Sequence, residues 1–476
     1  MFALSPIRSL ALALLAAMIV VLPARAEPFG TYLKPFAATS PWNARPVGAV
    51  LGDYEIPRSD YAPTLAEGKW STGVFLAKAS DKPVEVLGPV DRPGVWDPDA
   101  ETSRPSIVIP RWPAEVIPAS GSDGHADIVD PISGIVHSFF KLKNIDGVWR
   151  AKQYAWTRLD GRGWGDPAHY YQGARAAAVP TMGGVIRTHE VNNGDAVFRH
   201  ALAMSLTFNA LSPSHTYVFP ATAADRGAEK ANFGRIPEGA LLMLPPDYDT
   251  ASIKDARLRK VAETLKVYGA YVVDRNHGTP FVIYVENGTN LGLHKPVWNN
   301  TVARELDRMR AALRQVVSME GWLDGNDKPM QMEQRVNLLS MRGPWKVTKG
   351  DGPAGAFDTW QQAVVFPAGA DPVEQINIRG NSLHPVTWAR PLPGAAYRLS
   401  VTAKGGGALR VQLYESAALR QRLYDSGMLA DGQSVVFNWP EGQRGVTVIV
   451  RGGGAEPTSV RGTLMAVEPP AATLHR

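Results

Sequence analysis

Residues 397–401, Tyr-Arg-Leu-Ser-Val, alternate apolar and polar side chains, as a β-strand with one buried face does. Similar short runs follow at residues 411–414, 435–439 and 446–450, and Gly-rich turns separate them. Short strands at this spacing are typical of a small β-sandwich. The sequence therefore predicts a C-terminal β-sandwich over residues 336–470.

The part of the chain before this sandwich is also rich in strands. Gly, Asp or Asn separate strand-like runs at residues 128–129, 135–140, 149–156, 184–191 and 196–208. Helical spacing predicts two helices, over residues 258–268 with Gly269 as a cap and over residues 301–319. We therefore predict a mainly β protein, with a β-sandwich or jelly-roll-like main domain that carries two helices and is followed by the C-terminal sandwich.

Changes in composition divide the chain into five segments. These are a signal peptide (1–26), an extended Pro-rich segment packed on the main domain (27–120), a candidate catalytic domain (121–320), a polar linker (321–335) and a carbohydrate-binding-like β-sandwich (336–470). Prolines at 105, 110, 113 and 118 predict edge or turn positions rather than central strands in the second segment.

The N-terminus has the pattern of a secretory signal. Residues 10–22 are apolar, and Ala24-Arg25-Ala26 places small residues where a signal peptidase reads them. We expect cleavage near Glu27 and a secreted or periplasmic protein. No later stretch reaches the roughly 20 apolar residues of a membrane-spanning helix, so we expect no integral membrane segment after cleavage.

Composition excludes several kinds of chemistry. The chain has no cysteine, which excludes thiolate catalysis, iron–sulfur clusters and cysteine zinc sites. Its net charge is +5 without a long Lys/Arg run, so a nucleic-acid partner is not expected. We expect no cofactor, while a structural calcium ion bound by loop oxygens stays open.

Residues 122–130, Ser-Asp-Gly-His-Ala-Asp-Ile-Val-Asp, form the densest polar cluster. Asp127 and Asp130 fit a structural role, because aspartates commonly accept hydrogen bonds from turn amides. Asp123 and His125 are candidates for catalysis, since they could project from a loop into a cleft.

A second group of polar residues falls between residues 187 and 200. We expect a hairpin with a polar turn, on which Glu190 is a candidate general acid if its surroundings raise its pKa. His200 alternates with apolar residues, a pattern that favours a core histidine, and it stays a candidate for substrate binding together with Arg187. Asp274, at the end of a predicted strand, completes a set of carboxylates from which glycoside hydrolysis would need two.

Aromatic side chains are concentrated between residues 149 and 171, where there are six in 23 residues. Flat aromatic faces beside polar groups suit stacking on sugar rings. The candidates for substrate binding among them are Tyr154, Trp156, Trp164 and Tyr171. Trp164 lies in a Gly-rich turn, which makes it the best candidate for the surface.

Several motifs together resemble a broad group of secreted bacterial proteins. They are Ser40-Pro41-Trp42-Asn43, Asp123-Gly124-His125 with Asp130-Pro131, the segment 184–190, His200-Ala201-Leu202, Pro220-Ala221, and Tyr268-Gly269 with Asp274. In that group the motifs cover roughly the first 300 residues and a carbohydrate-binding-like sandwich often follows. The resemblance implies this domain layout and carries no activity with it.

Three functional hypotheses follow. The first is a secreted glycoside hydrolase that acts on a polysaccharide, with Glu190 as acid and Asp123 or Asp274 as base or nucleophile. The second is a lyase for an acidic glycan, with His125 or Tyr154 as base and Arg187 neutralising the sugar carboxylate. The third is a non-catalytic envelope or matrix protein that binds glycans. Both enzyme hypotheses require the catalytic candidates to meet in one aromatic-lined groove.

Overall fold

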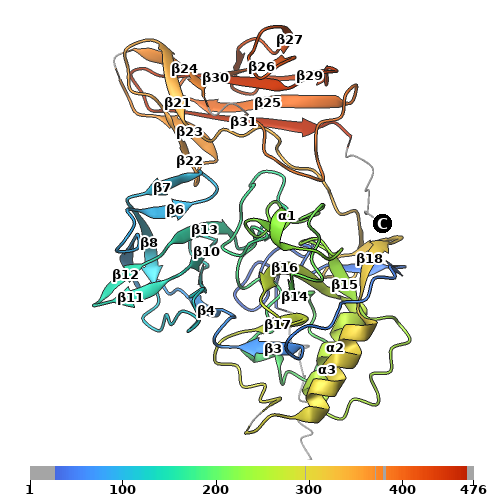
Figure 1. The fold of residues 1–476 in the computed structure, drawn as a ribbon. Helices are drawn as coiled ribbons and strands as arrows, with labels where there is room; N and C mark the ends of the chain where they lie inside the picture. The colour runs from blue at the N-terminus through green and yellow to red at the C-terminus, as the bar shows by residue number, and fades with distance from the viewer. Residues whose placement is uncertain (1–26, 295, 370, 379–381, 469–476) are drawn as a thin grey trace, which may run out of the picture.

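The computed structural model describes residues 27–294, 296–369, 371–378 and 382–468 (Figure 1). The expected signal peptide, residues 1–26, lies outside the described residues. No helix within the described ranges is long and apolar enough to cross a membrane. The expected fold class is confirmed, because the chain is mainly β and ends in a two-sheet sandwich.

Four sheets form the first part of the described chain, to residue 330. The largest has the order β2 (Val50–Leu51), β18 (Arg314–Ser318), β15 (Leu241–Met243), β16 (Ala270–Asn276), β14 (Leu202–Thr207), β17 (Phe281–Val285) and β3 (Thr64–Glu67). A second has the order β4 (Gly73–Leu76), β9 (Ala126–Asp130), β10 (Ile135–Phe140), β13 (Gln153–Arg158), β6 (Val95–Asp97) and β7 (Thr102–Arg104). The third consists of β11 (Lys143–Ile145), β12 (Val148–Arg150), β5 (Lys82–Leu87) and β8 (Ser106–Trp112), and the smallest of β1 (Arg45–Val47), β19 (Gly321–Leu323) and β20 (Pro329–Met330).

Alternation of side chains along the strands explains how these sheets stack. In β9, Ile128 faces a core shared with the sheet of β5 and β8, while Val129 faces a core shared with the largest sheet. The opposite face of the largest sheet is covered by α2 (Ala256–Val267) and α3 (Asn300–Ala312), visible at the lower right of Figure 1. The layers are therefore, in order, the sheet of β5 and β8, the sheet of β9, the largest sheet, and the helices α2 and α3.

The C-terminal part is a sandwich of two sheets around its own core. One sheet has the order β21 (Trp345–Lys349), β24 (Pro372–Asn377), β30 (Gly445–Gly453), β26 (Ala408–Tyr414) and β27 (Arg422–Asp425), with β28 (Leu429–Ala430) also paired to β26. The other has the order β22 (Ala356–Asp358), β23 (Ala363–Phe366), β31 (Thr458–Ala466), β25 (Ala396–Lys404) and β29 (Ser434–Asn438). The opening stretch 397–401 lies in β25, as its alternation predicts.

Two predicted elements differ in the structure. The second helix ends at Ala312, because Leu313 turns to extended backbone and β18 begins at Arg314. The predicted strand 184–191 is replaced by a short 3-10 helix, Thr188–Glu190. In that turn the Glu190 side chain accepts a hydrogen bond from the backbone N–H of Arg187, which stabilises the turn over an extended strand.

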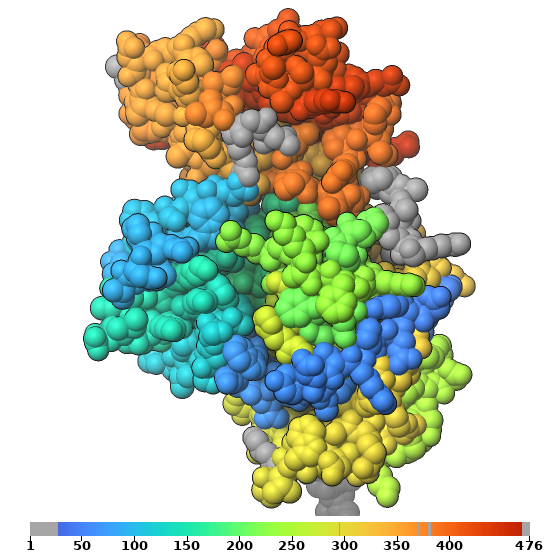
Figure 2. Space-filling view, viewed as in Figure 1, coloured from blue at the N-terminus to red at the C-terminus, as the bar shows by residue number. Residues whose placement is uncertain are grey.

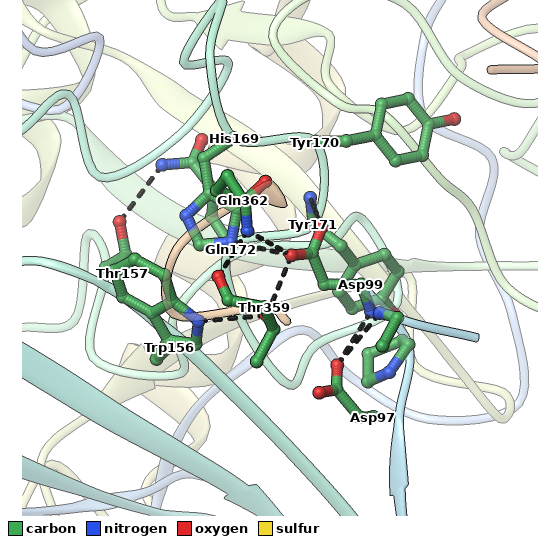
Figure 3. Close-up of polar contacts among 12 residues, drawn as sticks. Asp97, Asp99, Trp156, Thr157, His169, Tyr170, Tyr171, Gln172, Thr359 and Gln362 are labelled. Carbon is green, nitrogen blue, oxygen red and sulfur yellow. Dashed lines mark hydrogen bonds and ion pairs between the residues drawn. The ribbon is translucent and has the colours of Figure 1, made fainter. Parts of the chain in front are cut away.

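Among the contacts that hold the sandwich against the first part, two lie in separate places. At one, Asp99 accepts hydrogen bonds from the side chains of Thr359 and Gln362, in the loop between β22 and β23 (Figure 3). The same loop places Trp360 on Trp156, with ring centroids 5.2 Å apart. At the other, the Trp388 indole donates to the carbonyl of Ala221 at 2.6 Å. Figure 1 shows the sandwich above both the blue and the green parts of the chain.

Candidate functional site

The candidate site is a cluster of four carboxyl groups, contributed by Asp123, Asp225, Glu238 and Asp274. Asp274 belongs to β16, at a point where the pairing with β14 shifts register, so that Asp274 rather than Val273 lies opposite Ser205. Regular alternation would place Asp274 on the face of Val272, which is covered by helices. The shift places it instead on the face of Tyr284, whose hydroxyl donates to Asp274 Oδ2 at 3.4 Å.

Asp225 and Glu238 come from the irregular segment between β14 and β15. The Asp225 carboxyl group forms a hydrogen bond with that of Asp274, and it accepts the backbone N–H of Arg275 at 2.8 Å. The backbone N–H of Asp225 donates to Glu238 Oε1 at 3.0 Å. These bonds hold three carboxyl groups side by side.

Two cations lie beside this cluster. Arg275 is 3.7 Å from Asp225, and Arg175, whose side chain is only 1% exposed, pairs with Asp274. The Nη1 of Arg175 lies 3.2 Å from Asp274 Oδ2, and the guanidinium stacks on the ring of Tyr284 at 3.7 Å. Its Nε and Nη2 have no hydrogen-bond partner among the described residues. Buried donors of this kind are costly to leave unpaired, so they mark a place where a ligand or water oxygen would be favoured.

Asp123 and His125 reach the cluster from the loop before β9. Gly124 between them has φ +47°, and a Cβ there would lie 2.9 Å from the carbonyl oxygen of Leu142, so the turn requires glycine. Asp123 is partly exposed, and its carboxylate is close enough to raise the pKa of Asp225 and of Asp274. His125 is buried, and its Nδ1–H donates to the carbonyl of Phe139 at 3.1 Å.

The segments that carry these groups border a hollow in the surface. Figure 2 shows it between the teal and the green parts of the chain, which are the colours of the segments around Asp123 and Asp225. Tyr171 also belongs to this neighbourhood, because Glu238, Asp225 and Asp274 act on its hydroxyl. Burial, together with these carboxylates, raises the pKa of Tyr171 to about 12, so the phenol stays neutral and can donate a hydrogen bond.

Electrostatics separate the members of the cluster. Burial, with the negative charges of Asp225 and Asp123, raises the pKa of Asp274 to about 7, although Arg175 acts against this rise. Burial also raises the pKa of Asp225 and, more strongly, that of Glu238, whose Oε2 has no partner within the described part of the chain. A carboxyl group that still holds a proton near neutral pH can act as a general acid.

Glu190, His200 and Arg187 lie in a different place from this cluster. Glu190 Oε2 pairs with His200 Nε2 at 3.1 Å, and Arg187 Nε donates to Glu286 at 3.0 Å. Although burial acts against ionisation, His200 lowers the pKa of Glu190. This carboxyl group is therefore ionised and has no proton to donate as a general acid. The structure therefore brings together Asp123, His125 and Asp274, and it does not place Glu190 with them.

Asp127 and Asp130 have the structural roles expected of them. Asp127 is buried and accepts hydrogen bonds from the Thr181 hydroxyl and the Met182 backbone N–H. Asp130 forms a two-pronged ion pair with Arg111 of β8 and accepts the amides of the following turn. Neither side chain is free to act on a ligand.

The aromatic candidates require a correction. Trp164 was expected at the surface, but it is fully buried, stacked on Trp42 at 5.3 Å, and donates its indole N–H to Ala177. Tyr154 is also fully buried, with its hydroxyl on His137. Trp156 faces the C-terminal sandwich, where its N–H donates to Thr359 (Figure 3). Of the four, Tyr171 alone lies by the carboxyl groups.

Sequence reasoning missed Arg175, Asp225 and Glu238. None of them lies in a periodic element, since Arg175 and Asp225 belong to loops and Glu238 makes an isolated bridge with Tyr217. Asp225 follows Pro220-Ala221 closely, between the predicted strand 196–208 and the predicted helix 258–268. This position was the signal that could have indicated a loop at a site. Within the described residues, no group of three or more His, Asp or Glu side chains is placed to hold a metal ion.

Comparison with protein-family models gave no match, and neither did comparison with curated proteins. Among solved structures, the glycosylation-associated protein complex Gap123 of Streptococcus agalactiae matches at 15% identity and a TM-score of 0.17, over 26% of this chain and 44% of that one. This chain thus spans less than half of that neighbour's length.

Carbohydrate-binding modules are also among the neighbours. The N-terminal cellulose-binding domain of β-1,4-glucanase C from Cellulomonas fimi matches at 18% identity and a TM-score of 0.18, over 29% of this chain and 95% of that one. A family 29 module from Piromyces equi matches at 12% identity and a TM-score of 0.17, over 28% and 90% of the two chains. Because these scores are low, we base the proposed function on the geometry of the carboxyl cluster.

Proposed function

We propose that the protein is a glycoside hydrolase that acts on a polysaccharide outside the cytoplasm, with its active site at the carboxyl cluster. The observation that carries the proposal is the convergence of Asp123, Asp225 and Asp274, which come from three separate segments and act on one another's ionisation. Hydrolysis of a glycosidic bond needs two carboxyl groups with different protonation states. The environment of these residues supports that difference.

Asp274 takes the role of general acid. With a pKa raised to about 7, it is protonated in a large fraction of molecules at neutral pH. Arg175 and Tyr284 hold its Oδ2, which orients the carboxyl group. When Asp274 gives its proton to the leaving oxygen, Arg175 stabilises the carboxylate that remains.

Asp123 takes the role of the second carboxylate, as nucleophile or as base for water. It is partly exposed, which fits a group that meets water or the sugar ring. Asp225 shares a hydrogen bond with Asp274, and we assign it to holding the proton on that pair.

The lyase hypothesis finds less support in the surroundings of its two proposed bases. Burial and the nearby Arg175 lower the pKa of His125 to about 3, so its imidazole is a weak base. Tyr154 is fully buried against His137, so its hydroxyl is not exposed to a polymer.

The test measures release of reducing ends from a panel of neutral and acidic polysaccharides. We expect Asp274→Asn and Asp123→Asn to lose about 100-fold or more in rate while remaining folded. Asp249→Asn, at an exposed turn, is the matched control and should keep full activity. Glu190→Gln should also remain active, which separates this assignment from one that makes Glu190 the acid.

Two results would contradict the proposal. Products that absorb in the ultraviolet would show elimination, and the enzyme would then be a lyase. If the wild-type protein binds glycans without cutting any polymer in the panel, the glycan-binding hypothesis replaces the catalytic one.

A further inference from the structure

An exposed tryptophan lies against the turn that carries Asp123. Trp70 belongs to the connection between β3 and β4, and it is 44% exposed. Its indole packs on Gly121, where a Cβ would lie 2.7 Å from the ring atom Cε3. Gly121 begins a turn in which its carbonyl accepts the N–H of Gly124 at 3.3 Å, and Asp123 lies within this turn. The indole and the Asp123 carboxylate are therefore neighbours through one short turn.

The backbone around Trp70 is fixed on both sides. The N–H of Gly121 donates to the carbonyl of Lys69 at 2.8 Å, and the N–H of Asn287 donates to the carbonyl of Thr72 at 2.8 Å. Thr72 itself is fully buried. The fold thus holds the chain before and after Trp70 in place while it leaves the indole at the surface. A flat group presented in this way loses little freedom when it binds a ligand.

The indole also has ring surface that the protein does not use. Trp298 and Trp360 are exposed to a similar extent, but they stack on His294 and Trp156. Within the part of the chain that the structure describes, no aromatic ring stacks on Trp70. The group beside its ring is instead the Lys69 ammonium, whose Nζ lies 5.2 Å from the ring centre.

The surroundings of the indole favour a sugar over an apolar protein surface. Lys69 and Ser122 are exposed and Asp123 is partly exposed, so a dry contact here would bury charged and polar groups without partners. A sugar ring has an apolar C–H face that suits an indole, and hydroxyls at its edge that suit polar side chains.

The separation from Asp123 is short enough for one glycan chain to contact both residues. Gly121 and Asp123 are two residues apart, so their Cα atoms lie within about 7 Å of each other. A chain of a few sugar units spans this distance.

We propose that Trp70 forms a binding subsite for a sugar unit of the polymer, beside the unit whose bond is cut. The indole stacks on the C–H face of this sugar, and Lys69 and Ser122 serve its hydroxyls. The position of the subsite along the polymer rests on the proposed active site at Asp123 and Asp274. The stacking itself does not depend on cleavage.

Affinity gel electrophoresis of the full chain on soluble neutral and acidic polysaccharides tests the subsite. Asp274→Asn is the background, because its loss of activity keeps the polymer intact. We expect at least one polymer to retard this protein, and Trp70→Ala added to it to raise the Kd about tenfold, the loss of one stacking contact. Trp70→Phe keeps a smaller flat face and should recover part of the affinity. Trp298→Ala, the matched control at an exposed tryptophan, should bind as the background does.

Binding and cleavage separate this inference from the proposed function. Weaker binding in Trp70→Ala, with no cutting of any polymer by the wild type, would support the subsite and contradict the hydrolase. In an active enzyme, Trp70→Ala should raise KM and change kcat little, since the indole is distant from the reacting bond. If no polymer binds, or if a folded Trp70→Ala protein binds as tightly as its background, the subsite does not exist.

Discussion

At the scale of single residues, the protonation of Asp274 is the feature with the widest consequences. Burial and two neighbouring carboxylates raise its pKa, while the guanidinium of Arg175 and the backbone N–H of Arg275 lower it. The balance leaves a carboxylic acid that ionises near neutral pH. Arg175 is thus needed less for the resting state than for the state in which the proton has left.

A first prediction concerns the pH dependence of stability. The pKa of Asp274 is about 7 in the folded protein against 3.8 as its ordinary value, so the folded state binds more protons between these limits. The contribution of Asp274 to the free energy of unfolding is therefore full below about pH 4 and falls as pH rises toward 7. Urea unfolding across this range should give a shallower decline in Asp274→Asn than in wild type. Asp249→Asn should keep the wild-type slope, and equal slopes for all three proteins would contradict the raised pKa.

A second prediction concerns the pair of Glu190 and His200. Although burial of His200 acts against it, Glu190 raises the pKa of His200. The stabilisation that comes from this raised pKa is full below pH 6.5 and is lost as pH rises through the folded pKa of His200. The stabilisation that comes from the lowered pKa of Glu190 is full above pH 4.5 and is lost as pH falls through the folded pKa of Glu190. The pair stabilises most between these values.

We expect His200→Gln to cost about 3 kcal/mol at pH 5.5, because it leaves a largely buried carboxylate without its cation. The cost should be smaller at pH 9, where the imidazole of the wild type is neutral. Urea titrations at both pH values measure it, and His277→Gln, at an exposed position, serves as control. A cost that does not change with pH would show that packing, and not charge, is what His200 provides.

At the scale of elements, local sequence patterns were sufficient to predict a helix or strand whose spacing and end residues are encoded within the segment itself. The helix predicted over residues 258–268 is α2, capped by Asp255 at its start and followed by Gly269 at φ +73°. The strand predicted over 184–191 is absent. The Glu190 side chain instead bonds to the backbone N–H of Arg187, three residues away, and to the side chain of His200, ten residues away. Periodicity carries no information about such a bond.

The loop between β22 and β23 yields a third prediction. Trp360 is 38% exposed, yet it stacks on Trp156 and lies near Tyr154 and His137. Replacing it by alanine should cost about 1–3 kcal/mol, less than for a fully buried tryptophan. Calorimetry of Trp360→Ala should show the sandwich unfolding at a lower temperature than the first part. Val436→Ala, exposed on β29, should leave one unchanged transition, and an unchanged transition in Trp360→Ala would show that the stacking contributes nothing.

At the scale of the whole molecule, the mainly β fold and its C-terminal sandwich could be predicted, and the site only in part. The regular spacing of short strands indicated the C-terminal sandwich, because each strand has its own alternation of apolar and polar residues. Asp123 and Asp274 were recognised as candidates one at a time, but their meeting depends on the stacking of the sheets of β9 and β16. Arg175 and Asp225 lie in loops, whose course is set by tertiary contacts rather than by a repeating pattern.

A fourth prediction concerns the contacts that hold the sandwich against residues 217–225, in the green part of the chain beside the hollow. Trp388 holds Ala221, four residues before Asp225, and Thr387 donates to the carbonyl of Tyr217 at 2.9 Å. In Trp388→Ala we expect faster amide hydrogen exchange over residues 217–225, by about tenfold, because a tertiary contact of that segment is lost. Trp360→Ala is the matched control and should leave that segment unchanged. Equal exchange of residues 217–225 in wild type and Trp388→Ala would contradict this role.

The double fastening also bears on how the hollow can select what enters it. Opening by a hinge would have to break the contact of Asp99 with Thr359 on one side or that of Ala221 with Trp388 on the other. The two walls are therefore held at a set separation before any ligand arrives. A sugar chain would be selected by the fixed width of the hollow, and not by closure of the protein around it.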